Sequence, residues 1–348
     1  MDHYKSTLAI PPGTVILEQL KIRNMTQKEF AIRMDCSEKH ICNIINGKVQ
    51  LTNDVVSKLE LVLGLEKIFW IKLEAYYRDK LAIIDQEIKM DDDIIISKNI
   101  PYSDMVNNGW IEKTNKATEK VTFLRKYFEV STLMSLNNLQ IPGIRYRELS
   151  NDDRNDFALA VWSQQAKLKA RNVETNTINI KKLKKETNNI RSLLTLTPAE
   201  FCPKLKKILA DCGVALIFLP HLKGSFLHGS AFKDGKHIVL GLTIRGAYSD
   251  KFWFSFFHEF YHIIEEHIKD NANSEVNENE ADTFARNILL NPTDYEQFIK
   301  NHNFSEAEII SFAAKENVFP GIVVGRLQYD KLIGFNKHNN LRKKYILS

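Results

Sequence analysis

The most constraining feature of the sequence is an apolar run at residues 252–264 that carries two histidines and a glutamate, spaced His258-Glu259-x-x-His262. Histidines four positions apart lie about 40° apart around a helix and one turn along it, so both imidazoles face one point. Burying them within FWFSFFHEFYHII would be costly unless a metal or other partners satisfied them. The spacing therefore predicts a helix that supplies two zinc ligands, with Glu259 positioned to accept a proton from a water on the metal.

A second helical segment, NENEADTFARNILLNP, follows the motif and offers the third protein ligand that a catalytic zinc requires. Its residues Glu278, Ala281, Asp282 and Ala285 share one helical face. We expect Glu278 to be the third ligand and Asp282 to hydrogen-bond a ligand histidine and fix its tautomer. Glu280 is the competing ligand, although it points about 160° away from Glu278 on an ideal helix.

Three further histidines near the motif are not expected to bind the metal. His267 lies about 140° around the helix from His262, which turns it away from the ligand pair. His228 and His237 fall on strand-like runs, where single histidines are more often structural or exposed than catalytic.

The N-terminal region predicts a series of short helices. The box TQKE at 26–29 opens one of them, in which the threonine caps free amides and the glutamate reaches back. Asp35-Cys36 is a tight turn, and Ser37 then begins a helix that ends at Gly47. Two more helices are expected, the second ending near Leu81. Two helices joined by such a turn have the shape of a helix-turn-helix, although a helical docking domain could contain the same turn.

The second helix of a helix-turn-helix enters the major groove of DNA with its N-terminal residues facing base edges. The residues expected to face bases are Ser37, Glu38, Lys39, His40 and Asn43. Gln27, Lys28 and Lys48 are positioned for phosphates, which supply the sequence-independent part of the affinity. The predicted partner is double-stranded operator DNA, and the slightly basic local charge predicts modest, salt-sensitive binding.

Changes in composition along the chain predict three regions, at 11–84, 85–196 and 197–335. The segment 91–109 contains three aspartates, a proline and an Asn-Asn-Gly sequence, and it looks like a linker with little core of its own. From Gly213 onward, short β-rich runs precede the histidine helix, and helices follow to the end. The expected fold class is multidomain, with an all-α N-terminal domain, a helical middle region and an α+β C-terminal domain.

Composition narrows the alternatives. Cysteines 36, 42, 202 and 212 show no CxxC pairing, so neither a disulfide framework nor a thiolate zinc site is indicated and a reducing cytoplasm fits best. A net charge of +5 permits nucleic-acid binding without arguing for it alone. The N-terminus lacks a secretory signal, and the most apolar run is too short to span a bilayer. No membrane segment is expected.

The stretch SDKFWFSFFHEFYHII, followed by ENEADTFARNILLNP, resembles the ImmA/IrrE family of zinc metallopeptidases across residues 198–332. After HExxH, that family shows the pattern E-x-x-A-[ND]-x-F-A-x-x-[LI]-L-x-P. The matching positions are Glu278, Ala281, Asp282, Phe284, Ala285, Leu289 and Leu290. The resemblance implies a zincin-like fold with about one Zn²⁺ per chain, held by His258, His262 and Glu278, and Glu259 as the general base.

Two positions depart from the family pattern, because Tyr261 replaces the usual glycine and Asn291 precedes the proline where methionine or isoleucine is common. Members of the family that cleave proteins typically cut a transcriptional repressor. The resemblance therefore implies a protein partner.

The N-terminal sequence at 11–81 resembles the helix-turn-helix domain of HigA-type antitoxins in the XRE repressor superfamily, including the Ile-Asn-Gly turn and the Phe69-Trp70 helix. This resemblance implies operator binding, usually as a homodimer on a palindrome, and control of the protein's own operon. The whole arrangement is similar to fused XRE–ImmA/IrrE proteins, some of which act as antitoxins.

Three functional hypotheses follow. The first is a DNA-binding transcriptional regulator with a zinc-dependent metalloendopeptidase domain. The second is an antitoxin that represses its operon and neutralises a toxin, with a structural zinc site. The third is a protease whose N-terminal helices only dock substrate.

Overall fold

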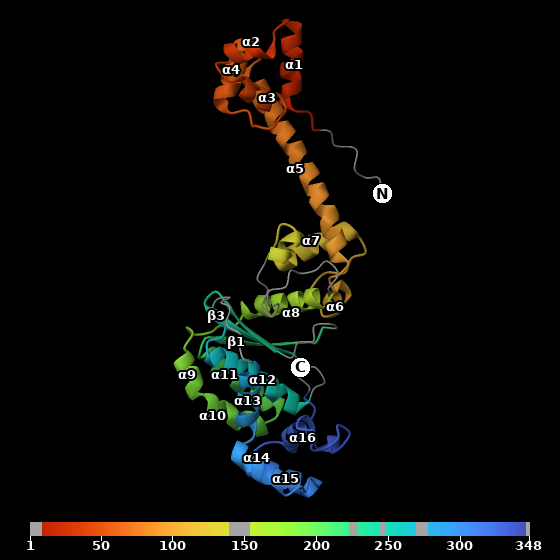
Figure 1. Ribbon diagram of the computed structural model, residues 1–348, viewed down its shortest axis with the longest axis vertical. Helices are drawn as coiled ribbons and strands as arrows, with labels where there is room; N and C mark the ends of the chain where they lie inside the picture. Colours follow the sequence, from red (N-terminus) through yellow and green to blue (C-terminus); the bar gives the residue numbers. More distant parts are fainter. Residues whose placement is uncertain (1–8, 139–153, 223–228, 244–247, 269–277, 346–348) are drawn as a thin grey trace. The chain divides into compact units, whose positions relative to one another are not determined.

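The computed structural model describes residues 9–138, 154–222, 229–243, 248–268 and 278–345, and the chain divides into two compact units (Figure 1). Unit 1 is Met1–Asp93 and unit 2 is Ile94–Ser348. Unit 1 is built from helices, whereas unit 2 combines helices with a small sheet. Among the described helices, none has both the length and the apolar character needed to cross a membrane.

Unit 1 consists of helices, three of which are started by side-chain caps. These helices are α1 (Pro12–Ile22), α2 (Gln27–Arg33), α3 (Glu38–Ile45) and α4 (Asn53–Leu63), followed by α5 (Lys67–Ser97). Thr26, Ser37 and Thr52 are N-caps, and each side chain accepts a hydrogen bond from a backbone N–H three residues later. The expected reach of Glu29 back to the cap is wrong, because its carboxylate lies 2.7 Å from the guanidinium of Arg33.

Helix α5 is longer than predicted. It continues past Leu81 to Ser97 and contains the three aspartates that the sequence assigned to a linker. An aspartate costs a helix only about 0.7 kcal/mol or less, and no glycine or proline interrupts the chain before Pro101. Tyr102 opens α6 (Tyr102–Asn107), and its ring and the Met105 side chain are buried in a core of unit 2. The expectation that this segment has little core of its own is therefore wrong, although the boundary between the two units, at Asp93, lies within it.

Unit 2 contains a three-stranded sheet in the order β1-β3-β2. Strands β1 (Val214–Leu219) and β3 (His237–Thr243) are parallel, while β2 (Gly229–Asp234) runs antiparallel to β3 and lies at an edge of the sheet. A turn joins β2 to β3, and Gly235 adopts a φ of 58° there. Strand β2 begins at Gly229, so His228, which the sequence placed on a strand-like run, lies outside the described residues.

Both faces of the sheet are covered by helices. Because successive side chains of a strand point to opposite faces, alternate residues belong to two different cores. Leu216 and Leu240 belong to the core that includes α11 (Pro198–Ala210) and α12 (Ser249–Ile264). Ile217 and Val239 belong to the other core, together with α8 (Arg154–Ala170), which lies across the opposite face (Figure 1). The sequence assigned α8 to the middle region, but in the structure it completes the fold around the sheet.

Further helices frame this assembly. They are α7 (Ala117–Phe128), α9 (Ile180–Lys185), α10 (Thr187–Arg191), α13 (Glu278–Leu289), α14 (Pro292–Lys300), α15 (Glu306–Lys315) and α16 (Pro320–Tyr329). A capping box starts α11, since the Thr197 N–H donates to the Glu200 carboxylate over 2.9 Å. Helix α13 packs directly against α12 and brings its first turn over the histidine motif.

Candidate metal centre and helix-turn-helix

Helix α12 is held in place by one strongly apolar face. Trp253, Phe256, Phe257 and Phe260 are fully buried in the main core of unit 2, which leaves the side of the helix that carries the motif facing α13. The helix begins at Ser249 without a side-chain cap, although Ser249 and Asp250 are both residues of the type that caps helices. The two residues are instead the first positions of the helix.

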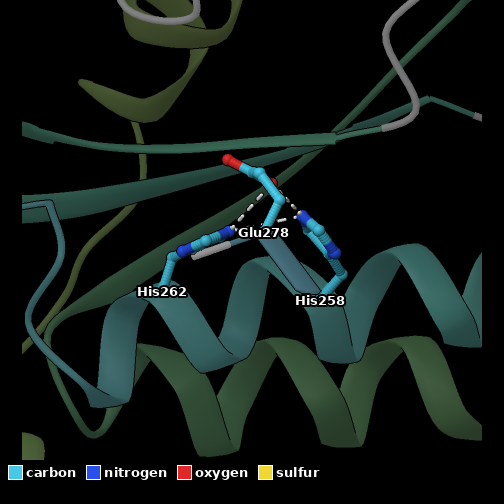
Figure 2. A group of neighbouring side chains, drawn as sticks. All are labelled: His258, His262 and Glu278. Atoms are coloured by element: carbon cyan, nitrogen blue, oxygen red, sulfur yellow. Dashed lines mark hydrogen bonds and ion pairs between the residues drawn. The ribbon is translucent and has the colours of Figure 1, made fainter. Parts of the chain in front are cut away.

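The structure brings His258, His262 and Glu278 together. The two histidines rise from α12 one turn apart, and Glu278 reaches between them from the first turn of α13 (Figure 2). The Nε2 atoms of the histidines are 3.3 Å apart, and Glu278 Oε2 lies 3.1 Å from His258 Nε2 and 3.6 Å from His262 Nε2. Among the described residues, this is the group of histidine, cysteine and acidic side chains arranged to hold a metal ion.

These distances can be tested against the geometry of a bound metal. Zinc bonds of about 2.0–2.2 Å in tetrahedral geometry place the ligand atoms roughly 3.3–3.6 Å apart. Two of the three observed separations, 3.3 and 3.6 Å, fall in that range, and the third, 3.1 Å, is slightly shorter. His262 is buried and Glu278 is 49% exposed, so the centre is open on the carboxylate side. The group therefore has a spacing and exposure that could accommodate a metal ion.

Asp282 adjoins the centre as predicted from its position on α13. Its Oδ1 lies 2.9 Å from His258 Nδ1, so the carboxylate can accept a hydrogen bond from that nitrogen and leave Nε2 as the metal ligand. Arg286, one turn further along α13, has its guanidinium 3.8 Å from the other carboxylate oxygen. This contact helps to keep Asp282 oriented toward the histidine.

The competing ligand Glu280 is outside the metal group. It accepts a hydrogen bond from the Tyr261 hydroxyl over 3.1 Å. The pKa of Tyr261 is raised, mainly by partial burial and next by this hydrogen bond to the carboxylate. Tyr261, inside the motif, therefore contacts the alternative carboxylate, which lies outside the group of His258, His262 and Glu278.

Glu259 packs against the start of the edge strand. A Cβ placed on Gly229 would lie 2.9 Å from Glu259 Cγ and 2.9 Å from a Leu242 methyl carbon. The absence of a side chain at Gly229 therefore makes room for the glutamate beneath β2. Sequence reasoning missed this glycine, because only the packing of α12 against β2 shows the contact.

The other histidines have distinct environments. His267 lies close to His262, with their Nδ1 atoms 3.3 Å apart, although neither nitrogen belongs to the metal group. His237 Nδ1 is 3.1 Å from the Thr175 hydroxyl, at the beginning of β3. Helical-wheel reasoning missed the contact of His267 because α12 ends at Ile264 rather than continuing to residue 267.

The α2–turn–α3 segment has the connectivity of a helix-turn-helix. After α2 the chain reverses at Asp35, which adopts a φ of 47°, and the Cys36 N–H donates to the Ala31 carbonyl over 3.0 Å. Phe30 and Ile41 are buried in the core of unit 1, so they hold the two helices together. Gly47 ends the second helix with a φ of 66°, and the ring of Tyr77 fills the space beside it.

All eight predicted DNA contacts remain accessible. Exposed side chains are found at Gln27, Lys28, Ser37, Glu38, Lys39 and Lys48, and half-buried ones at His40 and Asn43. The Ser37 hydroxyl is already used as the α3 cap, because it accepts a hydrogen bond from the His40 N–H over 3.2 Å. Lys39 and Asn43, one turn apart on α3, are the pair best suited to contact bases together.

Comparison with known proteins identifies one relationship. A stretch of 63 residues is 32% identical to an uncharacterized HTH-type transcriptional regulator, YddM, of Escherichia coli (strain K12). The stretch is 18% of this chain and covers 67% of that protein. No protein-family model matches the sequence. Through this similarity and the helix-turn-helix in unit 1, the chain belongs to the HTH-type transcriptional regulators.

Proposed function

We propose that this protein is a DNA-binding transcriptional regulator that also carries a zinc-dependent metallopeptidase centre of the ImmA/IrrE type. The metallopeptidase centre is proposed because His258 Nε2, His262 Nε2 and Glu278 Oε2 lie close together. In addition, the carboxylate of Asp282 faces the other ring nitrogen of His258. Two imidazoles and one carboxylate are the donor set of many catalytic zinc sites. Magnesium and calcium prefer oxygen donors alone, so zinc is the metal best matched.

When bound, zinc supplies Lewis-acid chemistry, which polarises a carbonyl and makes a water molecule more acidic. Glu259 is adjacent to the first ligand and serves as general base and then as general acid, accepting a proton and delivering it to the leaving amine. Its side chain is confined by the backbone at Gly229, which limits the directions in which the carboxylate can point. A confined base is favourable because less motion must be frozen during reaction.

The edge strand β2 favours a peptide as the substrate. Strand β2 is paired with β3 on one side and forms an edge of the sheet on the other, close to Glu259. An extended polypeptide can add to such an edge through main-chain hydrogen bonds, without requiring a particular sequence. We therefore infer that the substrate is an extended segment of a protein, such as a repressor.

Metal content and one conservative substitution test the peptidase. Purified protein should contain about one zinc per chain, and a well-folded protein without affinity for zinc would contradict the metal centre. Glu259→Gln removes the base while keeping the side-chain shape, so it should abolish peptide cleavage and spare zinc. His237→Gln is the matched control, because it changes a polar side chain in unit 2 that lies outside the metal group.

DNA binding is tested with the protein's own upstream region. Lys39→Ala combined with Asn43→Ala should weaken operator binding at least about tenfold in gel shifts, because base contacts typically contribute about 1–3 kcal/mol each. Lys72→Ala, at an exposed position on α5, should leave binding unchanged. Equal binding by the double variant and the unchanged protein would remove α3 as the reading helix.

The antitoxin hypothesis differs in one measurable respect. It requires the DNA-binding unit and a toxin partner, but no hydrolysis. If Glu259→Gln leaves gene regulation in cells intact while zinc remains bound, the centre acts structurally and the antitoxin function is favoured. Loss of regulation with retained DNA affinity would favour the peptidase.

A further inference from the structure

We propose that His267 is a positioning residue for the metal centre: it accepts a hydrogen bond from the Nδ1–H of His262 and holds that ring with Nε2 toward the metal. The inference rests on the proposed zinc site. It assigns a role to a histidine outside the HExxH motif and outside the group of ligand atoms.

The end of α12 brings His267 to this position. The Glu266 N–H donates to the Ile263 carbonyl over 3.1 Å, and the His267 N–H donates to the His262 carbonyl over 2.9 Å. Glu266 between them adopts a φ of 60°. These two bonds and the left-handed residue form a Schellman ending, which turns the chain back over the last helical turn. His267 is thereby returned to the side of His262, with its side chain only partly exposed.

A left-handed conformation at a residue other than glycine costs about 1–2 kcal/mol. The contacts that this helix ending creates must therefore offset that cost. The ring of His267 contacts the ring of Tyr261 at 5.6 Å between centroids, and its Nδ1 lies 3.3 Å from His262 Nδ1. Both contacts are made to the helix that carries the metal ligands.

The ring nitrogens of His262 and His267 that carry protons follow from which nitrogen of His262 faces the metal. A neutral His262 that binds metal through Nε2 must carry its proton on Nδ1. Nδ1 of His262 is then a donor, so the facing Nδ1 of His267 is the acceptor and His267 carries its own proton on Nε2. This arrangement selects the correct tautomer of His262 and restricts rotation of its ring, as second partners of metal-bound histidines generally do.

The two ligand histidines are therefore supported differently. His258 Nδ1 faces the carboxylate of Asp282 at 2.9 Å, whereas His262 Nδ1 faces a neutral imidazole at 3.3 Å. A carboxylate makes the stronger, charge-assisted hydrogen bond. We expect His258 to be held by the stronger hydrogen bond and His262 to depend mainly on correct orientation.

An isosteric pair of substitutions tests the role of His267. Asparagine can place its Oδ1 where Nδ1 of the histidine stands, while leucine has nearly the same shape as asparagine and no acceptor. In zinc competition titrations of the full chain, His267→Leu should weaken binding about 10- to 100-fold, the usual cost of losing such a partner. His267→Asn should remain within a few-fold of the unchanged protein. His237→Leu, which removes a comparable contact to Thr175, should have no effect.

The absorption spectrum of the cobalt-substituted protein gives a second readout, because it reports the geometry of the ligands directly. The His267→Leu spectrum should differ from that of the unchanged protein, and the His267→Asn spectrum should match it. Equal zinc affinities and equal spectra for the leucine and asparagine variants would overturn the role of His267. Failure of the unchanged protein to bind zinc would instead contradict the metal centre itself.

Discussion

The helix-turn-helix of unit 1 and the metal centre of unit 2 are built in opposite ways. The candidate DNA contacts lie within residues 27–48, and each helix that carries them is started by its own cap, Thr26 or Ser37. The metal group joins His258 and His262 to Glu278, which belongs to a different helix and reaches them only because α13 packs on α12. One site follows from local structure, while the other depends on packing between helices.

The difference extends to exposure. Six of the eight candidate DNA contacts are exposed, so substitution at these positions, apart from the helix cap Ser37, should change affinity for DNA and leave the fold unchanged. His262 is buried beside the aromatic core, so the metal centre and the packing of unit 2 are coupled. We therefore expect changes in unit 1 and unit 2 to have separable effects, and four predictions test this separation.

The largest effect is expected from the core of unit 1. Phe30 is fully buried, and Phe30→Ala should destabilise unit 1 by about 3–5 kcal/mol through lost burial and the cavity left behind. Hydrogen exchange should show faster exchange in α1–α4, while zinc affinity in unit 2 stays the same. Ile32→Ala on the same helix is the control, since this side chain is 72% exposed. Weaker zinc binding by the Phe30 variant would show that the two regions are not separable.

A smaller effect is expected from the third metal ligand. Glu278→Ala should weaken zinc by more than the roughly 100-fold that marks the upper range for outer partners, because a direct ligand is lost. Glu280→Ala removes a carboxylate two positions away that contacts Tyr261 instead, so it should change zinc affinity by no more than a few-fold. Competition titration with a chelator measures both variants. Equal losses would contradict the choice of Glu278 over Glu280.

The next effect concerns the outer partner of His258. Asp282→Ala should reduce zinc affinity about 10- to 100-fold, because His258 loses the acceptor on its Nδ1. The control is Asp294→Ala, which removes a carboxylate that pairs with Lys315 elsewhere in unit 2. If the two aspartate variants bind zinc equally well, Asp282 does not support the ligand.

The smallest effect is expected at the start of α3. Ser37→Ala should destabilise unit 1 by about 1 kcal/mol, the usual cost of losing an N-cap. Ser37→Asn should restore that stability in urea unfolding, because asparagine is an equally good cap. Gel shifts with the asparagine variant then separate the two roles of the serine: restored stability without restored operator affinity would mean that Ser37 also contacts DNA.

Short-range rules predicted much of both sites. The caps at Thr26 and Ser37, the turn at Asp35 and the stop at Gly47 depend on neighbours within a few positions, and the structure has each of them. The spacing of His258 and His262 on one helix face is of the same kind. The wrong predictions are of both kinds. Glu29 pairs with Arg33 instead of its cap and α5 continues through its aspartates, which are local effects, whereas α8 closes the second face of the sheet through long-range packing.

The sequence by itself determined the short helices of unit 1, the strands of unit 2 and the two histidines on one turn of α12. These features depend on periodicity and capping, which act over a few residues. Helix periodicity already favoured Glu278 over Glu280. Only the tertiary structure decided that α13 brings Glu278 to the histidines, that Gly229 makes room for Glu259 and that His267 returns to His262. Those contacts depend on how α13, β2 and the end of α12 pack, because packing brings together groups that sequence spacing leaves apart.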